Sequence, residues 1–132
     1  ARDHLVRSED RISHQLLELA CDLARQVIRQ ELRQSPQALK PLISEAVAQL
    51  VEDGLPATVR LHPDDLAVLE NPLRENSAGP LPELVADPSV SPGGCIVSSA
   101  STTVDASIEK RWARAIGNLG LEGPWNPENA DV

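Results

Sequence analysis

The chain has 132 residues, 41% of them hydrophobic, and a formal net charge of −8 at pH 7. Its only aromatic residues are Trp112 and Trp125, and Met is absent, so aliphatic side chains must form any core. The negative charge and the scarcity of rings on which bases could stack argue against nucleic-acid binding, and the same charge disfavours anionic membrane surfaces. The length fits one domain, or a small domain with a helical extension.

The cysteines and the hydropathy of the chain indicate its compartment. Cys21 and Cys95 are far apart and fit no redox or zinc-binding spacing. No segment approaches 18 consecutive apolar residues, and the first residues lack the charged-then-apolar order of a signal peptide. We therefore expect a chain without a membrane span that works in the reducing cytoplasm.

Residues 1–34 are predicted to form one long amphipathic helix. The stretch from Asp3 to Gln34 contains neither Gly nor Pro, and its apolar residues recur at spacings of three, four and seven. Such a stripe is longer than one short partner helix covers. We therefore predict a homodimer whose interface is formed by Leu5, Ile12, Leu16 and Leu23.

A second helix is predicted from Ser35 to about Asp53. Ser35 has the residue type of an N-cap, and Pro36 occupies the first helical position. Gly54 follows as a left-handed stop. The simplest arrangement is a helical hairpin in which this helix runs antiparallel to the first.

Short strands and a short helix are predicted next. The β-branched segment Ala57–Leu61 is predicted to be a strand, and Pro63 begins a helix that ends at about Glu70. Three prolines and a glycine indicate a loop over Asn71–Pro82. Glu83–Ala86 is predicted to be a second strand.

The remaining elements complete an α+β fold with a small three- to four-stranded mixed sheet. Asp87–Gly94 is predicted to be a tight turn in which Gly93 or Gly94 has a positive φ. Cys95–Ser98 forms a strand, and Ser99–Val104 continues as a hairpin to a fourth. Asp105 is predicted to cap a C-terminal helix that ends near Asn118. Residues 35–118 thus form the α+β domain, and residues 119–132 a loose acidic tail.

The sequence offers no recognisable catalytic, cofactor-binding or metal-binding motif. Gly93-Gly94 lacks the spacing and the lysine of a phosphate loop, and His4, His14 and His62 show no metal-ligand spacing. Ser98 and Ser101 lie outside any nucleophile elbow. We expect neither an enzyme nor a bound cofactor. A small hydrolase remains an alternative if the fold brings one of these serines beside a histidine.

Three motifs in order carry a resemblance to a known family. They are V-R-L-H-P-D-D-L (Val59–Leu66), A-D-P-S-V-S-P-G-G-C-I-V (Ala86–Val97) and V-D-A-S-I-E (Val104–Glu109). Together they resemble the C-terminal domain of the FliH/SctL family of bacterial flagellar and virulence-associated type III secretion. The resemblance implies a domain similar to the peripheral-stalk E subunit of rotary ATPases. One departure is the segment Ser99–Thr103, which lacks the family's usual hairpin glycine.

The resemblance also implies partners. Family members are stator-like proteins that form homodimers through their N-terminal helices, bind the N-terminal region of the secretion ATPase, regulate it, and tether it to the cytoplasmic sorting platform. The family's long N-terminal coil is mostly absent here, so contact with the sorting-platform or C-ring protein is expected through a segment outside this chain. The termini favour an injectisome over a flagellum.

The C-terminal helix offers candidate residues for contact with the ATPase. Arg111, Trp112 and Arg114 are of types that often dominate interfaces. Trp112 has an alternative role as a core aromatic residue, and the two arginines as solvated charges. The alternative for the whole chain is a helical dimerisation or scaffold module of unrelated function, which would not bind the ATPase.

Overall fold

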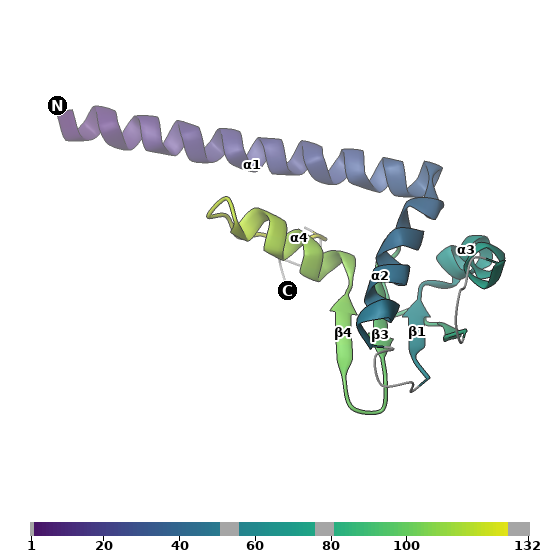
Figure 1. The fold of residues 1–132 in the computed structure, drawn as a ribbon. Coiled ribbons are helices and arrows are strands. Elements are labelled where there is room, and N and C mark those ends of the chain that lie inside the picture. The colour runs from purple at the N-terminus through teal and green to yellow at the C-terminus, as the bar shows by residue number, and fades with distance from the viewer. Residues whose placement is uncertain (1, 51–55, 76–80, 127–132) are drawn as a thin grey trace. The chain divides into compact units, whose positions relative to one another are not determined.

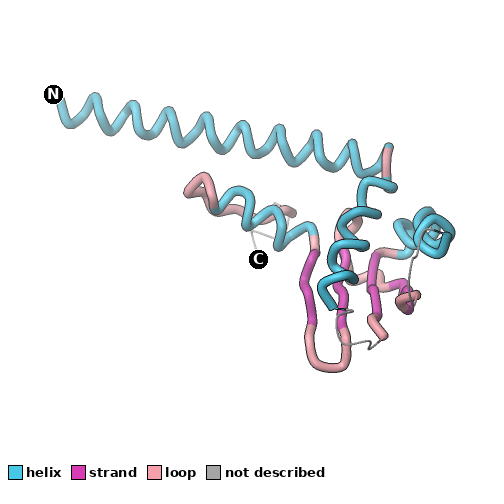
Figure 2. The backbone as a smooth tube through the Cα atoms, in the orientation of Figure 1, coloured by secondary structure: helices cyan, strands magenta, loops and turns pink. Residues whose placement is uncertain are grey.

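The structure is a computed structural model that describes residues 2–50, 56–75 and 81–126 (Figure 1, Figure 2). The chain divides into two compact units, Ala1–Glu31 and Leu32–Val132. Its elements, in chain order, are α1 (Arg2–Gln34), the 3-10 helix η1 (Pro36–Leu39), α2 (Lys40–Leu50), β1 (Thr58–Leu61), α3 (Pro63–Glu75), β2 (Glu83–Ala86), β3 (Cys95–Ser98), β4 (Thr103–Ala106) and α4 (Ile108–Gly117). The predicted α+β class is confirmed.

Helix α1 is continuous over 33 residues, a length of about 50 Å at 1.5 Å per residue. Nothing in its sequence interrupts the backbone hydrogen bonds, because it contains neither Gly nor Pro. The predicted single long helix is therefore confirmed. The antiparallel arrangement of this helix with the next one stays a prediction.

The second helix begins differently from the prediction. Pro36–Leu39 forms a 3-10 turn, and the Ser35 side chain makes no capping hydrogen bond. In an α-helix the carbonyl of Gln37 would accept from the N–H of residue 41, but Pro41 has no N–H. Lys40 N–H donates to Gln37 O in its place, which gives the tighter 3-10 turn. The predicted stop at Gly54 lies outside the described residues.

The four strands form a mixed sheet in the order β2-β1-β3-β4. Strands β1 and β2 are parallel and connected by α3, whereas β1 with β3 and β3 with β4 are antiparallel. Side chains alternate between the two faces of a sheet, and the register places Val59, Val97 and Val104 side by side on one face.

That face carries the hydrophobic core. The α2 helix lies across it (Figure 1), and its residues Ile43 and Ala46 are buried against the strands together with Leu69 of α3. The fully buried side chains include Val59, Leu61, Val97 and Cys95. The aliphatic core expected from the composition is present, and Arg60 and Asp105 lie on the opposite face.

Helix α3 is longer than predicted. It continues to Glu75 through Pro72, so the predicted loop from Asn71 is wrong in its first five residues. Proline in a helix interior normally costs about 3 kcal/mol. Here Leu73 packs against the hydrophobic core, a tertiary contact that favours another helical turn.

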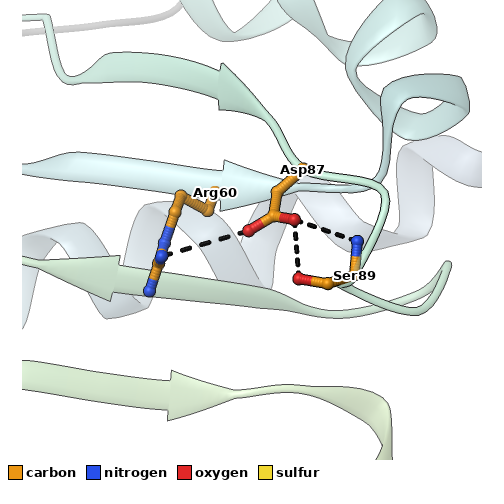
Figure 3. A network of polar contacts seen from close by, with 3 residues as sticks. All are labelled: Arg60, Asp87 and Ser89. Carbon is orange, nitrogen blue, oxygen red and sulfur yellow. Dashed lines mark hydrogen bonds and ion pairs between the residues drawn. The ribbon is translucent and has the colours of Figure 1, made fainter.

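The turn between β2 and β3 is fixed by side chains at both of its ends. At its start, the Asp87 carboxylate accepts hydrogen bonds from Ser89 N (2.9 Å) and Ser89 Oγ (2.6 Å), with Arg60 Nη1 4.0 Å away (Figure 3). At its end, Gly93 N donates to the buried Asp65 Oδ2 at 2.9 Å. Gly93 has φ = 94°, which confirms the predicted positive φ in this turn.

The junction of β4 and α4 corrects the predicted cap. Asp105 belongs to β4, paired with Ile96, rather than beginning the helix. Ser107 is the N-cap, because its Oγ accepts from Lys110 N at 3.3 Å. Asp105 still stabilises the junction, since its Oδ1 accepts from Ser107 N at 2.9 Å.

The predicted hairpin is confirmed, whereas part of the predicted loose tail is buried. The β3–β4 hairpin is closed by Ser99 N donating to Thr102 O at 2.8 Å. Among the described residues only glycines have positive φ, so this turn does not require the family's glycine. Within the segment predicted to be a loose tail, Leu121 and Trp125 are buried.

Candidate functional site

A groove of about 280 Å³ lies where α2, β4 and α4 meet. It is lined by Leu42, Glu45, Ala46 and Gln49 of α2, by Val104, Asp105 and Ala106 of β4, and by Arg111 and Arg114 of α4. Leu42, Ala46, Val104 and Ala106 provide an apolar base, Arg111 and Arg114 provide positive charge at the α4 side, and Glu45 and Asp105 add two carboxylates. The groove therefore suits a segment that combines an apolar side chain with a negative charge.

The two faces of α4 have different roles. Ile108, Trp112 and Ile116 are buried, whereas Arg111 and Arg114 are exposed. The arginines are three residues apart, so they lie on the same side of the helix. Two of the three residues proposed to contact an ATPase thus share one groove.

Trp112 has a different position from the two arginines. Its side chain is only 7% exposed. Its ring packs against Trp125 at a centroid distance of 5.5 Å and an interplanar angle of 61°, an edge-to-face arrangement that aromatic pairs favour. This position matches the core role that the sequence left as an alternative for Trp112.

The charged side chains around the groove differ in whether they already have a hydrogen-bonding or ion-pairing partner within the chain. The Asp105 carboxylate accepts from Ser107 N, and hydrogen bonds from Ser107, foremost from its side chain, lower the Asp105 pKa from its usual 3.8. Asp105 is therefore already bound to its own helix. Within the described ranges, Arg111 and Arg114 form no ion pair, so their guanidinium groups are available to a partner.

Sequence reasoning did not identify the α2 and β4 side of this groove. Leu42 and Ala46 lie on the apolar side of the predicted second helix, which is typical of ordinary core residues. Only the register of β4 against β3 brings Val104 beside them. No local sequence signal marks such a groove, because it depends on pairing between distant segments.

The predicted dimer stripe on α1 is exposed. Leu5, Ile12, Leu16 and Leu23 are 61%, 56%, 62% and 56% exposed. Leu19, which the sequence analysis did not select, is 55% exposed. Ile12, Leu16, Leu19 and Leu23 follow one another at steps of four, three and four, which is the spacing of a coiled-coil seam.

The serine-hydrolase alternative finds no support in the sheet geometry. Ser98 pairs with Thr58 at one end of β1, whereas His62 follows Leu61 at the other end.

Burial raises the pKa of the fully buried Cys95 to about 11, the dominant cause being loss of solvation. This thiol is therefore protonated near neutral pH, which disfavours nucleophilic chemistry.

Over residues 2–50, 56–75 and 81–126, no three His, Cys, Asp or Glu side chains gather in a way that would hold a metal ion. No helix in that part of the chain combines the length and apolar character required to cross a bilayer.

Comparison with known proteins identifies the family. Residues 2–115 match the family model described as flagellar assembly protein FliH. The chain is 34% identical over 101 residues to the flagellar assembly protein FliH of Escherichia coli K12, covering 76% of this chain and 44% of that protein. It is equally similar to FliH of Salmonella typhimurium LT2, covering 43% of that protein.

The chain thus spans less than half the length of these curated relatives. The names of both relatives and of the family model refer to the flagellum, which favours the flagellar alternative over the injectisome suggested by the termini. The family match covers α1 and the α+β unit up to Ala115 in α4. The chain belongs to the FliH family of flagellar assembly proteins.

Proposed function

We propose that this chain is the ATPase-binding part of a stator-like regulator of a bacterial export apparatus. The α+β unit binds the N-terminal region of the export ATPase and lowers its turnover. Helix α1 joins two copies of the chain, and a preceding segment of the longer family proteins tethers the complex to the sorting platform in the cytoplasm. The observation that carries the proposal is the family match over residues 2–115, which includes both the long helix and the α+β unit.

The groove between α2 and α4 supports a binding role. Arg111 and Arg114 are exposed, lie on one side of α4, and border an apolar base that contains Leu42 and Ala46. Arginine is enriched at interface hot spots because its planar fork binds carboxylates in a fixed geometry. A partner that presents carboxylates beside an apolar residue would match both parts of the groove.

The apolar stripe of α1 supports the proposed homodimer. Ile12, Leu16, Leu19 and Leu23 are each more than half exposed. Burial of apolar surface contributes about 25 cal/mol per Å², so a second α1 helix packed along this seam would stabilise an otherwise solvated row of large side chains. The coiled-coil spacing favours another long helix over a globular partner.

The proposal assigns no reaction to the chain itself, so its test uses the turnover of the partner. Purified export ATPase from the same system is titrated with the full chain, and phosphate release is measured at steady state. We expect turnover to fall as the chain is added, and the chain alone to release no phosphate. Unchanged turnover without complex formation would contradict the proposal.

Charge-reversal variants test the proposed contact. For Arg111→Glu/Arg114→Glu, the concentration of chain that gives half-maximal inhibition should rise at least tenfold. The reason is that two guanidinium groups at the interface become carboxylates. Arg74→Glu is the control: Arg74 is 59% exposed and pairs with Glu70 on α3, and it does not line the groove. Normal inhibition by the double variant would reject the contact residues while leaving the ATPase as a partner.

A further inference from the structure

Strand β4 is an edge of the described sheet, and no other described strand pairs with the backbone groups on its outer side. Ser99 N donates to Thr102 O, so residues 99 and 102 form a hydrogen-bonded pair. Such pairs alternate along an antiparallel ladder. With Ser98 opposite Thr103 and Val97 opposite Val104, Val104 and Ala106 direct their backbone groups toward β3. Thr103 and Asp105 direct theirs outward.

This edge lacks three of the features that protect sheet edges from an added strand, namely proline, lysine and a β-bulge. Natural edge strands are often blocked by proline, by lysine or by a β-bulge. The opposite edge, β2, lies between Pro82 and Pro88. The segment from Ser99 to Ala106 contains neither proline nor lysine, and β4 pairs with β3 in uninterrupted register. Thr103 and Asp105 are both exposed.

The groove described above lies beside the same strand. Val104 and Ala106 contribute to its lining together with Leu42 and Ala46, so an added strand would place alternate side chains over apolar surface. Arg111 and Arg114 lie at the α4 side of this groove, and Glu45 lies at the α2 side. Asp105 of β4 also lines it, and its carboxylate already accepts a hydrogen bond from Ser107 N. The charges therefore favour an incoming carboxylate at the α4 side only.

We propose that β4 accepts an extended segment of the partner as a fifth strand of the sheet. The segment hydrogen-bonds to the backbone of Thr103 and Asp105, places an apolar side chain over Leu42 and Ala46, and pairs a carboxylate with Arg111 or Arg114. This inference rests on the proposed function, because the segment is taken to belong to the N-terminal region of the export ATPase. Strand addition is an established mode of peptide recognition.

Hydrogen exchange gives the most direct test. The full wild-type chain is exchanged alone and with saturating ATPase, and the amides of residues 99–107 are resolved by fragmentation mass spectrometry. In the free chain, the amides of Val104 and Ala106 should exchange slowly and those of Thr103 and Asp105 fast. In the complex, we expect exchange at Thr103 and Asp105 to slow at least tenfold.

Two variants at Thr103 distinguish the contribution of its backbone N–H to binding from that of its side chain. Thr103→Pro removes an outward N–H that the β3–β4 ladder does not use, and proline is tolerated on such edges. Thr103→Val keeps the N–H and a β-branched side chain. We expect Thr103→Pro to raise the Kd for the ATPase at least tenfold, and Thr103→Val to change it less than twofold.

The outcomes distinguish this inference from the proposed function. No binding by the wild-type chain would reject both. Wild-type binding with unchanged exchange at Thr103 and Asp105, or with a folded Thr103→Pro variant that binds normally, would overturn only the added strand. Protection of these amides that rises with the concentration of the chain alone would overturn it in favour of self-pairing. If Thr103→Pro does not fold, the exchange measurement on the wild type decides.

Discussion

Among the described glycines, Gly94 is the one where an added methyl group would meet backbone atoms at less than 3 Å. A Cβ built there would lie 2.5 Å from Ile108 N, 2.7 Å from Ser107 Cα and 2.8 Å from Ser107 C. These are backbone atoms at the junction of β4 and α4, so no side-chain rotation relieves the contact. Overpacking in a core costs about 1–3 kcal/mol and sometimes more. We expect Gly94→Ala to cost about 3 kcal/mol of unfolding free energy.

A matched control exists in the same unit. Gly117 is the last residue of α4, and a Cβ there meets no atom within 4 Å. Gly117→Ala should stabilise the chain by up to about 1 kcal/mol, because alanine favours the helix over glycine.

Both changes are measured by urea unfolding and thermal melting, followed by the fluorescence of Trp112 and Trp125. A loss of about 3 kcal/mol corresponds to a fall of more than about 10 °C in Tm for a domain of this size. A Gly94→Ala variant that melts within about 2 °C of the wild type would refute the close approach of Gly94 to this junction.

Four other changes have defined outcomes. Asp65→Ala leaves the buried Gly93 N–H without its acceptor and should cost about 1–3 kcal/mol by urea unfolding, whereas Asp65→Asn, which keeps an acceptor, should cost less. Hydrogen bonds from Ser89 lower the pKa of Asp87 from its usual 3.8. Its ionised form therefore adds stability that is present above that pH and lost as the pH falls through the folded pKa, and Asp87→Asn should flatten this acid limb. Cys95, fully buried with a pKa raised to about 11, should react with a thiol reagent only as fast as the chain opens. Leu16→Glu should give monomers by light scattering, because a buried unpaired charge costs several kcal/mol.

Each of these expectations has a contrary result. Equal stability of Asp65→Ala and Asp65→Asn would show that the hydrogen bond to Gly93 contributes nothing. If the loss of stability at acidic pH is the same in Asp87→Asn as in the wild type, other carboxylates cause this pH dependence. Modification of Cys95 in the native state at the rate of a free thiol would contradict its burial. A monomeric wild-type chain at high concentration would reject the interface that contains Leu16.

The sequence predicted the elements whose signals are local. The absence of Gly and Pro predicted all of α1, and the Pro-Gly-Gly segment predicted the turn in which Gly93 has a positive φ. Two boundaries were wrong because a contact with another element decided them. Leu73 packs on the core and carries α3 through Pro72, and pairing with Ile96 keeps Asp105 in a strand.

The candidate site was only partly predictable. The sequence singled out Arg111 and Arg114 by residue type, and the structure shows both exposed and lining one groove. The partners across the groove could not be found, because Leu42 and Val104 are separated by 62 positions in the sequence and meet only through the sheet register. The outward backbone groups of β4 depend on that same register.

Calorimetric titration of the full chain into the export ATPase tests the central claim most directly. Two ATPase preparations are compared, the intact enzyme and one that lacks its N-terminal region. We predict saturable binding to the intact enzyme and none to the shortened one. Absence of binding to the intact enzyme, or equal binding to both, would contradict the proposed function.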